Sequence, residues 1–196
     1  MAIDLVHDIQ KGFRTILHCM SRPGTIKSME GLTGELSASS EGLPATFITA
    51  LTLLDREASF ALVGEQTNKL GEQIAAYTMS VQEKLSAADY VFITKQATKE
   101  QVINVFQEVK TGTLPNPQQS ATIILEAAFS DEGELILEGP GIKTTAELSI
   151  ANSKEWLEER RKANKEYPLG VDMILVDERS NVVCIPRTTV IKMCGV

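Results

Sequence analysis

Apolar residues recur at steps of three and four near the N-terminus, which is the spacing of one face of an amphipathic α-helix. The stripe consists of Val6, Ile9, Phe13, Ile16, Leu17 and Met20. Pro23 disfavours helical geometry at the residue before it and Gly24 permits a turn, so the pattern predicts that the helix ends in the segment Ser21–Gly24. Residues 31–42 are rich in Ser and Gly and favour a loop or short strands.

The following segments alternate between helix and strand patterns. Pro44 opens a helix over residues 45–54 that is apolar nearly all round, so we expect this helix to be buried. The short runs Ser59–Val63 and Tyr90–Ile93 indicate strands, the second because it is β-branched and aromatic. Two further helical stripes are formed by Leu70, Ile74, Tyr77 and Val81 and by Val102, Ile103, Phe106 and Val109. The alternation predicts an α/β layer architecture.

The second of these stripes has a start and a stop signal of its own. Thr98 and Gln101 have the spacing of a capping box, in which the hydroxyl and the amide each satisfy a backbone N–H at the helix start. Gly112 follows the stripe, and glycine is the residue that most often ends a helix. We therefore expect a helix between these two signals.

The second half of the chain favours hairpins. One hairpin is predicted from the extended runs 121–129 and 134–138, which flank a four-residue loop. A second is predicted from residues 172–176 and 182–185, and residues 190–193 continue the sheet in this prediction.

One strongly charged segment lies between the two predicted hairpins. Residues 154–165 are helical in pattern and nearly all charged, which is typical of a solvated surface helix anchored by Trp156 and Leu157. The sequence contains no internal repeat and no low-complexity linker. We therefore predict a single domain over residues 1–196.

Charge narrows the classes of partner. The 196 residues carry 19 Lys and Arg against 26 Asp and Glu, a formal net charge of -7, and 43% of them are apolar. Such a field repels nucleic acid and anionic membranes, although a small anion needs only two or three cations. No apolar run approaches the ~20 residues of a membrane span. The acidic N-terminal segment is unlike a signal peptide, so we expect a cytosolic protein.

The sequence offers little that resembles a metal centre or a catalytic centre. The two histidines, His7 and His18, share a helix face but lie roughly 16 Å apart along it, too far to bind one metal. The three cysteines are far apart and without a CxxC motif, which favours buried thiols over disulfides. The segment Gly139–Thr144 lacks the glycines of a phosphate loop, and nothing near Lys143 is typical of a Schiff-base lysine. We expect no metal and no cofactor.

Five polar residues remain as candidates for an anion site or a subunit contact: Arg22, Asp55, Arg187, Thr188 and Thr189. The last three interrupt an apolar hairpin, where they could hold an oxyanion or bond carbonyls at a sheet edge or a subunit contact. Arg22 stands at a helix end, where the helix dipole alone favours a cation. Asp55 stands at the end of the predicted buried helix, where the dipole disfavours an anion, so we expect it to pair with Arg56 or with a partner across the fold.

Six short motifs, in order along almost the whole chain, are specific as a set. They are Phe13-Arg14 with Met20–Gly24, Leu51–Asp55, Thr111–Thr113 with Pro117 and Ala121-Thr122, Gly139–Ile142, Tyr167–Asp172, and Ile185–Thr189. Together they resemble the H-subunit family of the bacterial carbon–phosphorus lyase system, which serves the use of phosphonates. The chain departs from the family pattern Pro-Glu-x-Gly-Ala-Thr at Gln118 and Ser120.

This resemblance implies a three-layer α/β/α sandwich with a mixed sheet, similar to the large domain of pyridoxal-phosphate-dependent transferases but without that cofactor. It also implies a cytosolic homodimer that joins the G, I and J subunits in a core complex. With the L subunit, members of the system convert ATP and an alkylphosphonate into a ribose 1-phosphonate 5-triphosphate. We therefore expect an obligatory subunit without catalysis of its own. The alternative is an enzyme subunit that contributes nucleotide- or phosphonate-binding residues.

Overall fold

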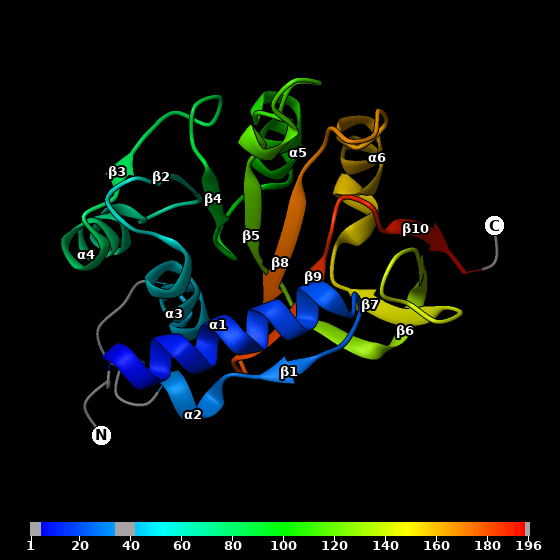
Figure 1. Ribbon diagram of the computed structural model, residues 1–196, viewed down its shortest axis with the longest axis horizontal. Coiled ribbons are helices and arrows are strands. Elements are labelled where there is room, and N and C mark those ends of the chain that lie inside the picture. Colours follow the sequence, from blue (N-terminus) through cyan, green and yellow to red (C-terminus); the bar gives the residue numbers. More distant parts are fainter. Residues whose placement is uncertain (1–4, 34–41, 195–196) are drawn as a thin grey trace.

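A seven-stranded mixed sheet forms the centre of the protein, as the computed structural model shows for residues 5–33 and 42–194 (Figure 1). The strand order is β1-β9-β8-β5-β4-β2-β3. The strands are β1 (Lys27–Ser28), β2 (Ser59–Val63), β3 (Val81–Gln82), β4 (Tyr90–Ile93), β5 (Thr122–Glu126), β8 (Asp172–Val176) and β9 (Asn181–Ile185). Strands β3, β2, β4, β5 and β8 are parallel, whereas β9 runs antiparallel to both of its neighbours.

A smaller antiparallel sheet packs beside the first one. Its order is β10-β6-β7, with β6 (Phe129–Glu138), β7 (Ala146–Ile150) and β10 (Val190–Met193). Buried residues of this sheet, among them Leu135 and Leu148, belong to the same hydrophobic cluster as Met173 of β8. The two sheets therefore share one core.

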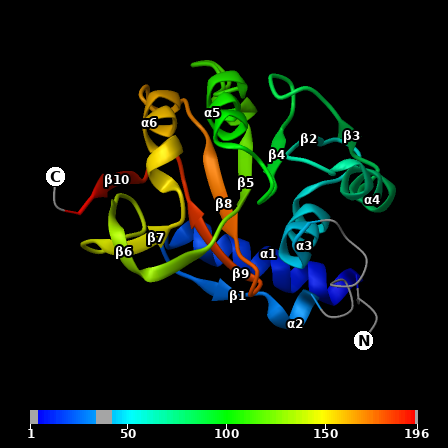
Figure 2. The same ribbon diagram turned by 180° about the vertical axis from the view of Figure 1, so that it is seen from behind.

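Helices cover both faces of the large sheet. They are α1 (Leu5–Ser21), α2 (Glu30–Thr33), α3 (Pro44–Leu53), α4 (Asn68–Thr78), α5 (Lys99–Glu108) and α6 (Ser153–Ala163). On β5, Ile123 and Leu125 pack in the cluster that contains residues of α5 and α6, whereas Ile124 packs in the cluster that contains residues of α1, α3 and α4. Figure 2 shows α5 and α6 side by side on the face opposite α1. The alternation of side chains along β5 thus separates two helical layers, and the predicted α/β class with a mixed sheet is confirmed.

Local signals in the sequence determine several of these elements. Strands β2 and β4 have the predicted bounds. The capping box of α5 is present, because Gln101 N–H donates to the Thr98 hydroxyl (3.3 Å) and Thr98 N–H donates to Gln101 Oε1 (2.8 Å). Helix α3 is buried from Ala45 to Leu51, as its uniformly apolar sequence predicts. None of the helices within the described ranges has the length and apolarity to cross a membrane.

The first predicted hairpin is wrong. Strand β5 pairs with β4 and β8, and residues 130–133 are part of the continuous strand β6 rather than a loop. The residues Ile123–Leu125 are all buried, which is the property of a parallel strand covered on both faces rather than of a hairpin with one solvated face. The second predicted hairpin is confirmed as the antiparallel pair β8–β9.

Four smaller predictions also need correction. Val81 begins strand β3 rather than extending α4, because Met79 takes a left-handed conformation (φ 60°) and ends the helix. Helix α5 ends at Glu108, before Gly112, since Val109 is already extended. Residues 190–193 pair with β6 in the small sheet and do not continue the large one. A one-turn helix, α2, occupies the start of the segment predicted as loop or strand, and residues 34–41 lie outside the described ranges.

Candidate functional site

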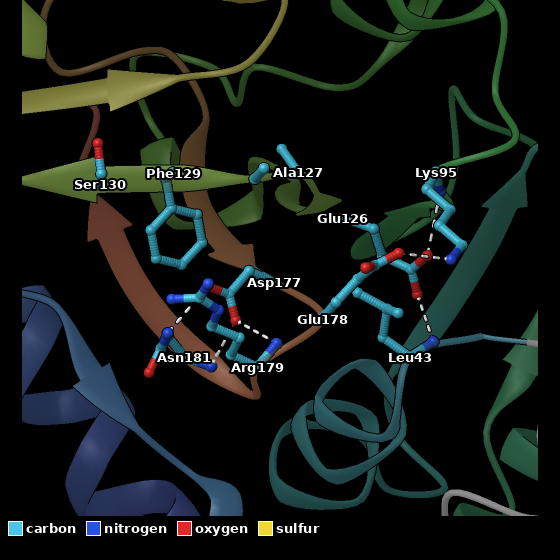
Figure 3. A pocket seen from close by; sticks show the side chains of 11 residues that line it. Leu43, Lys95, Glu126, Ala127, Phe129, Ser130, Asp177, Glu178, Arg179 and Asn181 are labelled. Carbon is cyan, nitrogen blue, oxygen red and sulfur yellow. Dashed lines mark hydrogen bonds and ion pairs between the residues drawn. The ribbon is translucent and has the colours of Figure 1, made fainter.

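A cavity of about 560 Å³ opens where β5 and β8 end (Figure 3). The carboxyl ends of parallel strands are the usual place for ligands in open α/β sheets. The residues that line it come from the start of α3, the loop after β4, the β5–β6 connection and the β8–β9 turn: Leu43, Lys95, Glu126, Ala127, Ala128, Phe129, Ser130, Asp177, Glu178, Arg179 and Asn181. A second cavity of about 190 Å³ shares Lys95 and residues 126–128 with the first. We call the two together the edge cleft.

Glu126 is the most deeply buried carboxylate of the edge cleft, with 5% of its surface exposed. Its Oε1 accepts hydrogen bonds from Leu43 N–H (2.8 Å) and the Thr46 hydroxyl (2.5 Å), and its Oε2 accepts one from Lys95 N–H (3.0 Å). Leu43 is the N-cap of α3 and has no side-chain oxygen to serve that role. The carboxylate of Glu126 therefore caps α3 from the neighbouring strand, where the helix dipole favours a negative charge.

Asp177 organises the β8–β9 turn on the other side of the edge cleft. Its Oδ1 accepts hydrogen bonds from Arg179 N–H (2.9 Å) and Asn181 N–H (2.8 Å), and its Oδ2 accepts one from the Asn181 side chain (2.9 Å). At the rim, Lys95 Nζ and Glu178 Oε1 form an exposed ion pair at 2.7 Å. This hydrogen bond raises the pKa of Lys95 and lowers the pKa of Glu178.

The edge cleft is therefore polar, but its polar groups are engaged in the fold. Both buried carboxylates, Glu126 and Asp177, accept hydrogen bonds from the backbone. The residues that line the two cavities include neither a histidine nor a cysteine. Within the described ranges, no group of three or more His, Cys, Asp or Glu side chains is placed to hold a metal ion. The arrangement suits binding or support better than acid–base or nucleophilic chemistry.

Arg187 joins three segments of the chain. Its guanidinium group donates to both carboxylate oxygens of Asp172, through Nε (3.2 and 3.3 Å) and NH2 (2.6 Å). The same group donates to the carbonyls of Pro117 (3.1 Å) and Pro168 (3.4 Å) and to the hydroxyl of Ser120. The Arg187 and Asp172 side chains are 18% and 23% exposed. The structure thus gives Arg187 partners inside the chain.

The other predicted site residues lie in different surroundings. Thr189 is buried and its carbonyl accepts hydrogen bonds from Arg160, whereas Thr188 is exposed. Arg22 is exposed at the end of α1, where its NH1 lies 3.2 Å from His18 Nδ1. Partial desolvation and the charges of Arg22 and Lys27 lower the pKa of His18.

Asp55 was predicted to pair with Arg56 or with a partner across the fold, and the hydrogen bonds and ion pairs of the described residues show neither. Its Oδ1 accepts hydrogen bonds from Glu57 N–H (2.8 Å) and Ala58 N–H (3.2 Å) and so closes the turn after α3. These two N–H donors offset the unfavourable effect of the helix dipole on a negative charge at the end of α3. None of these hydrogen bonds connects Asp55 or Arg22 to Arg187.

Two features of the site were not predicted. Glu126 follows directly on the buried run Ile123–Leu125, and a carboxylate at the end of such a strand is a signal that the sequence did contain. Arg160, outside the edge cleft, is the second feature. It is buried on the helix that was predicted to be solvated, although it follows the predicted anchors Trp156 and Leu157 by four and three residues, the spacing of one helix face.

Comparison with known proteins covers nearly the whole chain. The family model described as bacterial phosphonate metabolism protein (PhnH) matches residues 2–192. A relative named as a C-P lyase subunit protein, HtxG, from Stutzerimonas stutzeri is 28% identical over 194 residues, covering 95% of this chain and 87% of that protein. The alpha-D-ribose 1-methylphosphonate 5-triphosphate synthase subunit PhnH of Rhizobium meliloti (strain 1021) is 28% identical over 190 residues, covering 95% of this chain and 91% of that protein.

Proposed function

The chain belongs to the family of bacterial phosphonate metabolism proteins (PhnH), and from this premise we propose that it is an obligatory subunit of a carbon–phosphorus lyase complex in phosphonate catabolism. Two relatives that span nearly the same length are named as subunits of such a system. In this proposal the chain contributes binding surface to the complex and has no catalytic centre of its own. The carboxylates of the edge cleft support this reading, because Glu126 and Asp177 both accept hydrogen bonds from the backbone and so hold the fold together.

An exposed apolar stripe on α1 is the observation that carries the proposal. Val6, Phe13 and Leu17 are 77%, 51% and 55% exposed. Their spacings of seven and four residues place them on one face of the helix, while Ile16 and Cys19 of the same helix are buried in the core. Large apolar side chains gathered on one exposed face are typical of a protein–protein contact.

The proposal extends to the partners and the location. We propose that the stripe on α1 is covered by a second copy of this chain or by one of the G, I and J subunits, in the cytoplasm. A single domain with the architecture of the large domain of pyridoxal-phosphate-dependent transferases, without the cofactor, is also part of the proposal. The core shared by the two sheets supports the single domain.

The edge cleft favours one alternative. Its larger cavity, at about 560 Å³, lies within the ~300–1,000 Å³ of small-molecule sites. In this alternative the chain contributes part of a nucleotide or phosphonate site to the complex. Substitution of residues at the cleft would then impair ligand binding and leave assembly intact, whereas substitution on the α1 stripe would do the reverse.

Co-expression with the G, I and J subunits tests the proposal. The double variant Phe13→Ser/Leu17→Ser removes apolar surface, and Gln10→Ser/Arg14→Ser is the matched control because these two residues are exposed on the same helix at the same spacing. We expect both variants to fold, the first to be lost from the purified complex, and the control to be retained. Equal retention of the two variants would contradict a role for the stripe.

A further inference from the structure

Arg160 carries a positive charge into the interior of the protein. It lies on α6 with 4% of its surface exposed. Its NH1 and NH2 groups each donate to the Thr189 carbonyl at 3.3 Å, and NH2 also donates to the Pro186 carbonyl at 3.0 Å. In the part of the chain that the structure describes, its Nε has no hydrogen-bond partner and no ion pair joins it to a carboxylate. Buried charges are normally paired, so this environment is incomplete.

The charge of Arg160 persists despite burial. Desolvation lowers its pKa to about 10, against the opposing effect of the negative Asp172, so the guanidinium is protonated at neutral pH. Asp172 itself is held by Arg187 at 2.6 Å. The carboxylate that acts on Arg160 electrostatically is therefore already engaged by another cation.

A second buried donor adjoins Arg160. Thr189 is 2% exposed, and among the described residues its hydroxyl has no hydrogen-bond partner. The carbonyl of the same residue is bonded to Arg160, so the two unsatisfied groups belong to residues in direct contact. Unsatisfied buried polar groups are rare in native proteins, and each one calls for an explanation such as an ordered water or a bound ion.

Both residues line a cavity of about 130 Å³ between α6 and the β9–β10 connection. Its lining consists of Leu157, Arg160, Arg161, Asn164, Arg187, Thr189, Val190 and Ile191. Three of these residues are arginines and none is acidic, in a chain with a formal net charge of -7. The volume lies well below the ~300 Å³ of larger ligand sites. It therefore suits a tetrahedral oxyanion and not a whole nucleotide.

We propose that this cavity binds a phosphoryl oxyanion, either inorganic phosphate or the phosphonate group of an alkylphosphonate, with the Nε–H of Arg160 and the hydroxyl of Thr189 as donors. Neither donor atom is exposed to the cavity as the structure stands, so binding requires side chains of the lining to move aside when the ion enters. Arg161 contributes a further positive charge while it is paired with Glu158 at the surface. The proposal does not depend on assembly with other subunits.

Isothermal titration calorimetry of the isolated chain tests this site, with sodium phosphate and methylphosphonate as separate ligands at pH 7 and chloride at equal ionic strength as the blank. Thr189→Val removes the hydroxyl and leaves the carbonyl contacts of Arg160 in place. Arg160→Lys keeps a charge but loses the planar fork. Lys162→Gln is the matched control, because Lys162 lies on the same helix and does not line the cavity.

We expect saturable binding to the unmodified chain and to Lys162→Gln, and weaker binding to Thr189→Val. For Arg160→Lys we expect the dissociation constant to rise about tenfold or more, since charge-assisted hydrogen bonds dominate oxyanion affinity. If both phosphate and methylphosphonate bind, the site recognises the oxyanion group that they share. If only one of them binds, that one is the kind of ion that the site takes. Heats equal to the chloride blank, or Thr189→Val with unchanged affinity, would overturn the proposal. Either failure would leave the proposed subunit role standing, because co-purification tests that role separately.

Discussion

Replacement of Arg187 by lysine is expected to destabilise the isolated chain, because the guanidinium of Arg187 satisfies acceptors of four residues at once. It donates to Asp172, to the carbonyls of Pro117 and Pro168, and to the hydroxyl of Ser120. A lysine ammonium is a single nitrogen and cannot make the two-pronged contact with Asp172 while also reaching the two carbonyls.

The size of the effect follows from these contacts. A hydrogen bond to a charged group contributes about 1.5–3 kcal/mol, and an acceptor left buried without a donor costs about 1–3 kcal/mol. Lysine keeps part of the attraction to Asp172. The Arg187 and Asp172 side chains are 18% and 23% exposed, so water screens their interaction in part. We therefore expect a loss of about 1–3 kcal/mol in the free energy of unfolding. For a domain of this length each kcal/mol lowers the midpoint of thermal unfolding by about 2–4 °C.

Urea denaturation and thermal melting of the isolated chain measure this loss. Arg161→Lys is the matched control, since Arg161 is 62% exposed and makes one ion pair, with Glu158; the same substitution there is expected to cost at most about 0.5 kcal/mol. A double-mutant cycle with Asp172→Asn isolates the contribution of the ion pair. If Arg187→Lys melted together with Arg161→Lys, the contacts within the chain would contribute little and the reasoning would be refuted.

Further predictions concern two other carboxylates. Glu126→Gln places an amide N–H against donors of Leu43, Thr46 or Lys95, so we expect the free energy of unfolding to fall by about 1–3 kcal/mol, measured by urea denaturation. Equal stability of the variant and the unmodified chain would refute the capping role. Burial opposes ionisation of Asp89, but hydrogen bonds from Lys110 (2.6 Å) and Ser59 (2.8 and 2.6 Å) outweigh it and lower its pKa. Its contribution is present above the unfolded value of about 3.9 and is lost as the pH falls through the lower folded pKa. The stability difference between the unmodified chain and Asp89→Asn should therefore begin to narrow as the pH falls below about 4, and a constant difference between pH 7 and pH 3 would contradict this.

Elements with local signals could be predicted from the sequence. The capping box of Thr98 and Gln101 joins residues three apart, and the buried helix after Pro44 depends on its own apolar composition. The strand pairing could not be predicted in the same way. Strand β5 contains the uninterrupted apolar run Ile123–Leu125, which indicates a strand covered on both faces but does not identify the strands beside it. Its actual neighbours, β4 and β8, are distant in the sequence.

Of the two buried or half-buried arginines, one could be singled out from the sequence and the other could not. Arg187 stood out because it interrupts an apolar hairpin, and its carboxylate partner, Asp172, begins the adjacent strand of that hairpin. Arg160 did not stand out, because it lies in the charged run Glu158–Lys162 and resembles its neighbours. Its burial depends on the β9–β10 connection, whose carbonyls at Pro186 and Thr189 bind it from 26 and 29 residues away. The helix periodicity places Arg160 on the same face as Trp156 and Leu157, but it does not reveal the carbonyls that bind the guanidinium there.

Reconstitution of the complex tests the central claim most directly. The measurement is the release of adenine from ATP in the presence of methylphosphonate, by the G, I, J and L subunits with and without this chain, and by this chain alone. The account predicts release only when the chain and its partners are combined. Release by the isolated chain above a heat-inactivated control, or equal release by the partners in its absence, would contradict an obligatory subunit that has no catalysis of its own.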